Sequence, residues 1–274
     1  MTYRAPVSDI LFSMVHEAGM EPDRKDGIYA GLGDGFAEAT LNEAGKFAEA
    51  VLAPLNRAGD KEGAKSEAGK VTAPQGFANA YRQWAAGGCN AITGPVDFGG
   101  SDLPVLLNTA CIEIWSAANV AFSICPLLTL GAIEAMEAQA TETLKNLYLA
   151  QLVSGEWTGT MNLTEPQAGS DLGALKTRAE RQPDGTYKIF GSKIFITMAS
   201  TTWPTTSSIS CSRVCPMRQT AHAAFRFFWF RNFSSMPMAC LGPATIFFAP
   251  LWNTSSASMP HRPAPWSMAI MAVP

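Results

Sequence analysis

The chain has 274 residues, of which 47% are apolar and 16% charged, which is typical of a globular protein with a sizeable core and excludes a disordered chain. The net charge of −3 excludes the basic surface that nucleic-acid binding requires. Six cysteines without paired spacing exclude a disulfide-rich secreted scaffold, and no secretory signal opens the sequence. Free thiols indicate a reducing compartment, so we expect a cytoplasmic protein.

Up to about residue 155, the spacing of apolar residues predicts helices. We expect helices over residues 6–20, 30–56, 74–87, 103–122, 126–138 and 141–153, and a loop over residues 57–74. Ser8 or Asp9 is the expected N-cap of the first helix, and Pro126 is expected at the first position of the fifth. Residues 114–133 carry no charge, but polar side chains and Pro126 favour a pair of buried helices over a membrane span.

From Glu156 onward the pattern changes to that of strands. Aromatic and β-branched residues predict strands at residues 157–164, 176–181, 187–190 and 193–197, with a turn at 183–186. Helices followed by antiparallel strands indicate an α+β protein rather than a doubly wound one. The glycine-rich run at 31–35 follows no strand, so we do not expect it to bind a dinucleotide.

The composition changes abruptly after Thr197. Residues 1–197 hold all 23 acidic and 15 of the 20 basic side chains, a net charge of −8. Residues 198–274 hold five arginines and no acidic residue, where an even distribution would place about six acids. A natural domain needs charged groups to remain soluble, so we expect residues 198–274 to be a non-native tail.

Two motifs lie in the strand region: TEPQAGSD at residues 164–171 and GSKIFIT at residues 191–197. The first, on local physics alone, is a strand end entering a polar turn, where the Thr164 and Ser170 hydroxyls are able to hydrogen-bond a planar polar ligand. Together the motifs resemble those of the acyl-CoA dehydrogenase family, in particular the branch with the 3-methylmercaptopropionyl-CoA and long-chain enzymes. The resemblance covers residues 1–197.

The resemblance implies a fold of three parts: an all-α N-terminal domain, a middle antiparallel β-barrel and a C-terminal helical bundle. We therefore expect the helical domain at residues 1–155, with 1–30 as an extension. The first strands of the barrel are expected at residues 156–197. The helical bundle is expected to be absent from this chain.

The resemblance also implies an FAD cofactor. The residues that match flavin-lining positions of the family are Met161, Leu163, Thr164, Gly169, Ser170, Phe195 and Thr197. Thr164 is expected to bond the pyrimidine side of the ring, and Thr197 to hydrogen-bond near N5. Phe195 takes the place of an aromatic residue, often tryptophan, that packs against the ring. Gly169 and Ser170 are expected at the flavin and acyl-CoA entrance, with Ser170 also contacting substrate.

The implied activity is α,β-dehydrogenation of an acyl-CoA thioester in fatty acid metabolism. An electron-transfer flavoprotein would accept the electrons, and the family is usually homo-oligomeric. The family's base is a glutamate of the C-terminal bundle, so we expect no catalytic residue here and read Glu113, Glu134 and Glu165 as helix-surface or motif residues. No metal site is expected, because Cys211 and Cys215 have no second ligand pair.

Two alternatives remain open at this level: an acyl-CoA oxidase-like flavoprotein, and a non-enzymatic, inactive remnant. For the chain as written we expect weak or absent FAD binding and no turnover.

The genetic code supports an out-of-frame tail, because Met198-Ala199 is encoded ATG-GCN and a reading begun two bases later gives a forced glycine. Permitted codons for residues 198–204 then read Gly-Glu-His-Asp-Met-Ala. Residues 226–231 and 251–261 also give sequences similar to the family in this frame, so we expect a frameshift.

Overall fold

The structure is a computed structural model of the chain. It describes residues 3–20, 26–67, 70–181, 183, 187–198, 208–214, 226–232, 247–248 and 270–271. The chain divides into two compact units, and each is described by itself. The first comprises Met1–Trp157 and Thr201–Thr205, and the second comprises Thr158–Ser200 and Thr206–Pro274.

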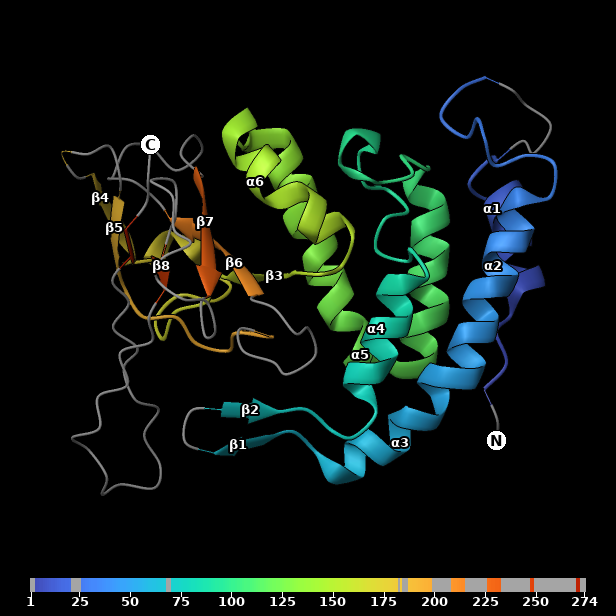
Figure 1. Cartoon of the computed structure of the whole chain (residues 1–274), viewed down its shortest axis with the longest axis horizontal. Helices are drawn as coiled ribbons and strands as arrows, with labels where there is room; N and C mark the ends of the chain where they lie inside the picture. Colours follow the sequence, from blue (N-terminus) through green and yellow to red (C-terminus); the bar gives the residue numbers. More distant parts are fainter. Residues whose placement is uncertain are drawn as a thin grey trace. The chain divides into compact units, whose positions relative to one another are not determined.

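The first unit is mainly helical (Figure 1). Its elements are α1 (Val7–His16), α2 (Phe36–Phe47), the π-helical turn η1 (Ala48–Leu52), α3 (Ala53–Glu62), α4 (Phe77–Ala86), the 3₁₀ turn η2 (Val96–Phe98), α5 (Val105–Gln139) and α6 (Glu142–Val153), with a hairpin of β1 (Lys65–Glu67) and β2 (Lys70–Thr72). The long helix α5 contacts α2, α3 and α6. It is therefore the element around which the unit is built.

Aromatic side chains from α4 and α5 form the centre of this core. The Trp84 and Trp115 rings meet edge to face with centroids 5.6 Å apart, and Phe122 lies 6.4 Å from Trp84. All three are buried, and such pairs contribute beyond the area they remove from water. The buried Tyr81 hydroxyl donates to the Gly155 carbonyl at 2.9 Å, so the end of α6 is tied to α4.

Several predicted helix limits are wrong. In α1 neither Ser8 nor Asp9 is the N-cap, because the helix begins at Val7 with Pro6 in the cap position and no side-chain cap bond. The helix expected over 30–56 begins later, at Phe36, after a glycine turn, and runs on through η1 and α3.

The π-helical turn η1 has a local cause, the proline just after it. Pro54 has no N–H to donate, and its ring would clash with the carbonyl of Ala50 in a regular helix. A wider turn before the proline accommodates it.

The loop expected over 57–74 is also wrong, since α3 and the β1–β2 hairpin occupy most of it.

Helix α5 is broken at Asn119, not at Pro126. Asn119 has non-helical backbone angles (φ −160°, ψ 90°), and its Oδ1 accepts the Phe122 N–H at 3.1 Å, as an N-cap does. Its Nδ2 donates to the Leu52 carbonyl of η1 at 3.2 Å. Pro126 instead lies inside the second half of the helix. The side chain of Asn119 therefore caps a half-helix and joins it to the π-helical turn.

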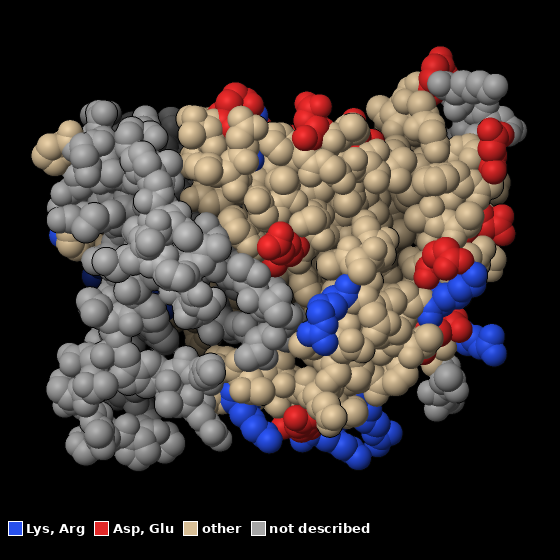
Figure 2. Space-filling model, viewed as in Figure 1, with Lys and Arg blue, Asp and Glu red and all other residues tan. Residues whose placement is uncertain are grey.

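Among the described residues, α5 is the helix long and apolar enough to cross a membrane by length and composition. Its most apolar stretch has a mean hydropathy of 1.6, and 56% of that stretch is buried inside the protein, as in a core helix. On the face seen in Figure 2, acidic side chains prevail along the upper edge of the helical unit, and basic side chains lie mainly over its lower half, beside a few acidic ones.

The second unit holds the remaining strands. They are β3 (Thr158–Asn162), β4 (Arg178–Arg181), β5 (Tyr187–Phe190), β6 (Ser208–Val214), β7 (Arg226–Asn232), β8 (Phe247–Phe248) and β9 (Ile270–Met271), with a 3₁₀ turn η3 (Leu172–Ala174). One sheet has the order β3-β6-β7-β8-β9, and β4 pairs with β5 in a separate antiparallel hairpin. The strands expected near 157–164, 176–181 and 187–190 are confirmed.

Two expectations for this unit are corrected. The sheet is not wholly antiparallel, because the β3–β6 and β7–β8 pairs are parallel. Residues 193–197 form no strand, since Phe195 and then Met198 have positive φ angles of 55° and 59° that interrupt extended backbone. Most of the turn expected at 183–186 lies outside the described residues.

Candidate functional site

The candidate site begins at β3, the first strand of the second unit. Thr158, Thr160 and Asn162 of this strand are buried. Met161 points the other way, as the alternation of a strand requires, and is 54% exposed. The strand thus presents an apolar side chain on an open face, two residues before the Leu163-Thr164 pair.

The two sequence motifs are bonded side by side. The Ile194 N–H donates to the Thr164 carbonyl at 2.9 Å, and the Thr160 hydroxyl donates to the Thr197 carbonyl. Ile194 is bonded to Thr164, and the later residue Thr197 is bonded to the earlier residue Thr160. Residues 193–197 therefore run antiparallel to residues 160–164. Motifs about thirty positions apart in sequence therefore share one local structure.

A buried carboxylate lies at the junction of these motifs. Glu165 Oε1 accepts from the Lys193 ammonium at 2.8 Å, from the Thr177 N–H at 3.0 Å and from the Thr177 hydroxyl. Oε2 accepts from the Lys176 N–H at 2.8 Å and from the Gln167 amide at 2.6 Å. The side chains of Glu165 and Lys193 are 2% and 6% exposed. Both carboxylate oxygens are thus fully occupied by donors.

The donors keep Glu165 ionised. Burial alone would raise its pKa, but hydrogen bonds from Lys193, Thr177 and Lys176 outweigh burial and lower the pKa to about 2. A saturated carboxylate with so low a pKa is a structural acceptor and is unsuited to take a proton from a substrate. Glu113 and Glu134 lie exposed on α5, as the sequence indicated.

The residues predicted to line a flavin lie along these two segments. Met161, Gly169, Ser170, Phe195 and Thr197 are exposed, and Leu163 and Thr164 are half-buried. Phe195 is 88% exposed, and its positive φ is uncommon for an aromatic residue and costs free energy. The Thr197 carbonyl, as distinct from its hydroxyl, is bonded to Thr160. Five of the seven residues thus belong to the bonded segments 160–165 and 193–197, and Gly169 and Ser170 follow after Glu165; both apolar and hydroxyl groups are in reach of solvent.

Sequence reasoning missed the residues that support this arrangement. Lys193 lies within the second motif, and its Nζ also donates to the Leu163 carbonyl at 2.9 Å. Thr177 lies between the motifs, packed against Gly191, where a Cβ would stand 2.1 Å from the Thr177 hydroxyl oxygen. The sequence held one signal for this contact, namely the opposite charges of Glu165 in the first motif and Lys193 in the second.

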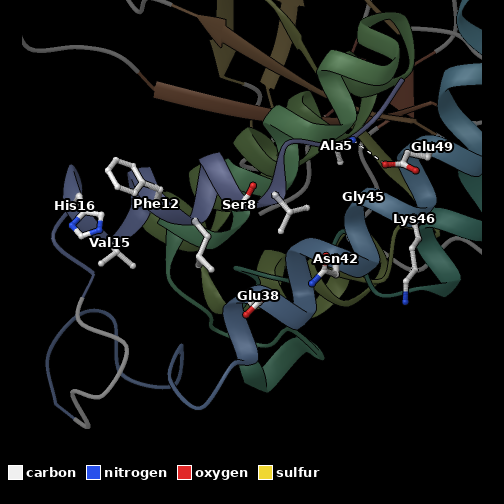
Figure 3. Close-up of a pocket in the computed structure, with 12 residues that line it drawn as sticks. Ala5, Ser8, Phe12, Val15, His16, Glu38, Asn42, Gly45, Lys46 and Glu49 are labelled. Atoms are coloured by element: carbon white, nitrogen blue, oxygen red, sulfur yellow. Dashed lines mark hydrogen bonds between the residues drawn. The ribbon is translucent and has the colours of Figure 1, made fainter. Parts of the chain in front are cut away.

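A separate groove of about 640 Å³ lies in the first unit between α1 and α2. In Figure 3, the Phe12 and His16 rings lie at one end, with centroids 4.3 Å apart, and the Ala5 N–H donates to Glu49 at the other, at 2.9 Å. None of the seven predicted flavin residues lines this groove.

Comparison with known proteins shows which protein family the chain is related to. The family model "Acyl-CoA dehydrogenase, N-terminal domain" matches residues 37–156, and "Acyl-CoA dehydrogenase, middle domain" matches residues 160–229. The second match continues past the composition boundary at Thr197.

Individual relatives agree with the family models. A 3-methylmercaptopropionyl-CoA dehydrogenase of Ruegeria pomeroyi is 44% identical over 197 residues, which is 72% of this chain and 34% of that protein. The structure of butyryl-CoA dehydrogenase from Megasphaera elsdenii has a TM-score of 0.56 at 20% identity, over 86% of this chain and 55% of that one. An FAD complex of PigA has a TM-score of 0.58 at 22% identity, over 87% and 56%.

These matches establish the ancestry and the fold. The chain spans about a third of the length of the Ruegeria pomeroyi relative. The two family models match consecutive domains, in the order in which the helical and strand-bearing units occur. The chain belongs to the acyl-CoA dehydrogenase family.

Proposed function

We propose that residues 1–197 are the helical domain and the first strands of the middle β-barrel of an FAD-dependent acyl-CoA dehydrogenase, which oxidises the Cα–Cβ bond of an acyl-CoA thioester. The observation that carries the proposal is the hydrogen bonding between residues 160–165 and 193–197, which joins two motifs of the family into one surface. The names of relatives that act on acyl-CoA supply the substrate class.

The exposed side chains of this surface fit a flavin. Met161 and Phe195 offer apolar area to a planar ring, and hydroxyls on Thr164 and Thr197 offer hydrogen bonds to its polar edge. FAD, when bound, supplies a hydride acceptor at N5. In this proposal Thr164 orients the pyrimidine side of the ring and Thr197 bonds near N5. Gly169 and Ser170 stand at the entrance, with Ser170 also toward the acyl-CoA.

We assign no proton-abstracting base among the described residues. The reaction needs a carboxylate free to accept the α-proton, and Glu165 has both oxygens occupied. The chain as written is proposed to turn over no substrate and to bind FAD weakly or not at all. In the complete enzyme, a bound flavin would supply electrons to an acceptor such as an electron-transfer flavoprotein. The enzyme is proposed to be a cytoplasmic homo-oligomer.

Residues 198–274 are proposed to be read out of frame. The loss of all acidic residues and lysines after Thr197 supports this. The middle-domain match, which extends to residue 229, runs past the limit that this proposal gives to the in-frame sequence. The nucleotide sequence decides between the two limits.

The experiment is a titration with FAD followed by anaerobic addition of an acyl-CoA. For the 274-residue chain we expect weak or absent FAD binding and no bleaching of the flavin, and we expect Phe195→Ala to weaken any binding that is measured. For the protein translated in the restored frame we expect stoichiometric FAD that bleaches on adding acyl-CoA. A folded but colourless restored-frame protein contradicts the function, and turnover by the 274-residue chain contradicts the absence of a base.

The same experiment separates the alternatives. An acyl-CoA oxidase would reoxidise its reduced flavin rapidly in air, whereas a dehydrogenase would need the separate acceptor. A non-enzymatic remnant would show neither FAD binding nor reduction in either frame.

A further inference from the structure

We propose that the Glu165–Lys193 ion pair is a positioning device that fixes the spacing between segments 163–171 and 193–197. The proposal rests on the proposed function in so far as these segments carry flavin-facing residues. Neither residue is assigned a contact with the cofactor or the substrate. Both would act through the backbone that they hold in place.

The burial of the pair argues that it does more than add stability. Removing two charges from water is costly, and an apolar pair of similar size often stabilises a protein as well or better. What an ion pair supplies, and an apolar pair does not, is a fixed direction and distance between two atoms. A buried pair at the junction of two motifs is therefore suited to fix their register.

The contacts of the pair join three stretches of chain. The Lys193 ammonium contacts both the Leu163 carbonyl and the Glu165 carboxylate. The same carboxylate accepts the backbone N–H groups of Lys176 and Thr177, which lead into β4. Loss of one charge would leave its partner buried without a counter-charge and would release all three stretches together.

The flavin-facing residues lie close to these anchors along the chain. Thr164 directly precedes Glu165, and its carbonyl is bonded to the residue after Lys193. Phe195 and Thr197 follow Lys193 by two and four positions. A shift of one segment against the other would therefore change the separation of Thr164 from Thr197, the two hydroxyls proposed to contact the flavin.

The first test is amide hydrogen exchange of the 274-residue chain without flavin. The decisive variant is the double substitution Glu165→Gln with Lys193→Met, which leaves no unpaired buried charge and so remains informative if either single variant fails to fold. A matched control removes the exposed pair Glu43–Lys46 on α2, whose side chains are each 72% exposed, as Glu43→Gln with Lys46→Met. Lys193→Arg keeps the charge and tests rescue.

We expect the double variant to exchange about tenfold faster in segments 163–171 and 193–197, while α5 stays within about twofold. The control variant should match the unaltered chain, and Lys193→Arg should recover part of the protection. Unchanged exchange in the two segments overturns the proposal. An equal increase throughout the second unit also overturns it, because the pair would then be stabilising without positioning.

The second test is the FAD titration of the same variants. We expect the dissociation constant for FAD to rise about tenfold in the double variant, with a shift in the spectrum of the bound flavin. Faster exchange with unchanged FAD affinity and spectrum overturns the link to the flavin. If the unaltered chain binds no FAD, hydrogen exchange decides whether the pair fixes the spacing, and the titration of the restored-frame protein decides whether the proposed flavin surface exists.

Discussion

Individual residues of the second unit show how a short motif encodes a bonded structure. Glu165 and Lys193 were both visible as motif members, yet nothing in their spacing revealed that one carboxylate would take five donors. That count depends on Thr177 and Lys176, which lie outside both motifs. A linear pattern identifies which residue types recur, whereas buried contacts depend on how the chain between them folds back.

The pKa of Glu165 gives a prediction for acid stability. Its folded pKa of about 2 lies below the ordinary 4.5. The ionised carboxylate therefore contributes fully to the free energy of unfolding above pH 4.5, and this contribution is lost as the pH falls toward 2. At neutral pH the lowered pKa corresponds to a contribution of at most about 3 kcal/mol to the free energy of unfolding, at 1.36 kcal/mol per pKa unit. In urea unfolding, the unaltered chain should have a higher free energy of unfolding than Glu165→Gln, and this difference should narrow from pH 7 to pH 3.

The control for this measurement is Glu43→Gln, which removes an exposed partner of Lys46 and should change stability little at any pH. A gap for Glu165→Gln that stays constant, or widens, on acidification would show that the carboxylate is not held ionised in the folded protein.

Gly191 packs so closely against Thr177 that it leaves no room for a side chain. A Cβ there would lie 2.1 Å from the Thr177 hydroxyl oxygen and 2.9 Å from its Cα, so Gly191→Ala must displace Thr177 and its bonds to Glu165. We expect a loss of about 2 kcal/mol in unfolding free energy. Gly131→Ala is the matched control, because no atom lies within 4 Å of its Cβ position in α5. Equal stability of the two variants in thermal unfolding would refute the close contact.

At the scale of elements, the sequence located most helices and strands but not their ends. The apolar spacing of α4 and α6 is clear, and both appear close to where they were expected. The break in α5 was misplaced because proline is a common first residue of a helix, whereas the cap in fact comes from Asn119. The cap also binds η1, and a contact between distant elements leaves no periodic signal in sequence.

The break in α5 is therefore testable through Asn119. Asn119→Ala removes the cap of the second half-helix and leaves the Leu52 carbonyl without its donor from Asn119. We expect a loss of about 2–3 kcal/mol in unfolding free energy, since a cap and a buried hydrogen bond are lost together. Asn146→Ala, at an exposed position of α6, should cost much less in the same denaturation series. Comparable losses would mean that Asn119 does not join the two elements.

At the scale of the whole molecule, the chain divides into two compact units. The aromatic core of the first unit lies entirely within Met1–Trp157. We expect a fragment of residues 1–157 to fold, with a helical far-ultraviolet spectrum, a near-ultraviolet signal from Trp84 and Trp115, and one cooperative transition. A fragment that is helical but lacks the near-ultraviolet signal would show that its core needs the second unit.

We propose that residues 1–197 are the leading part of a flavin-dependent dehydrogenase whose reading frame is lost just after them. The abrupt loss of acidic residues and lysines after Thr197 supports this proposal. The most direct test is to resequence the genomic DNA across the codons for residues 195–204. We predict a missing base, whose restoration continues the reading frame of the family. The same bases, confirmed, would contradict the frameshift and make residues 198–274 a genuine part of the protein.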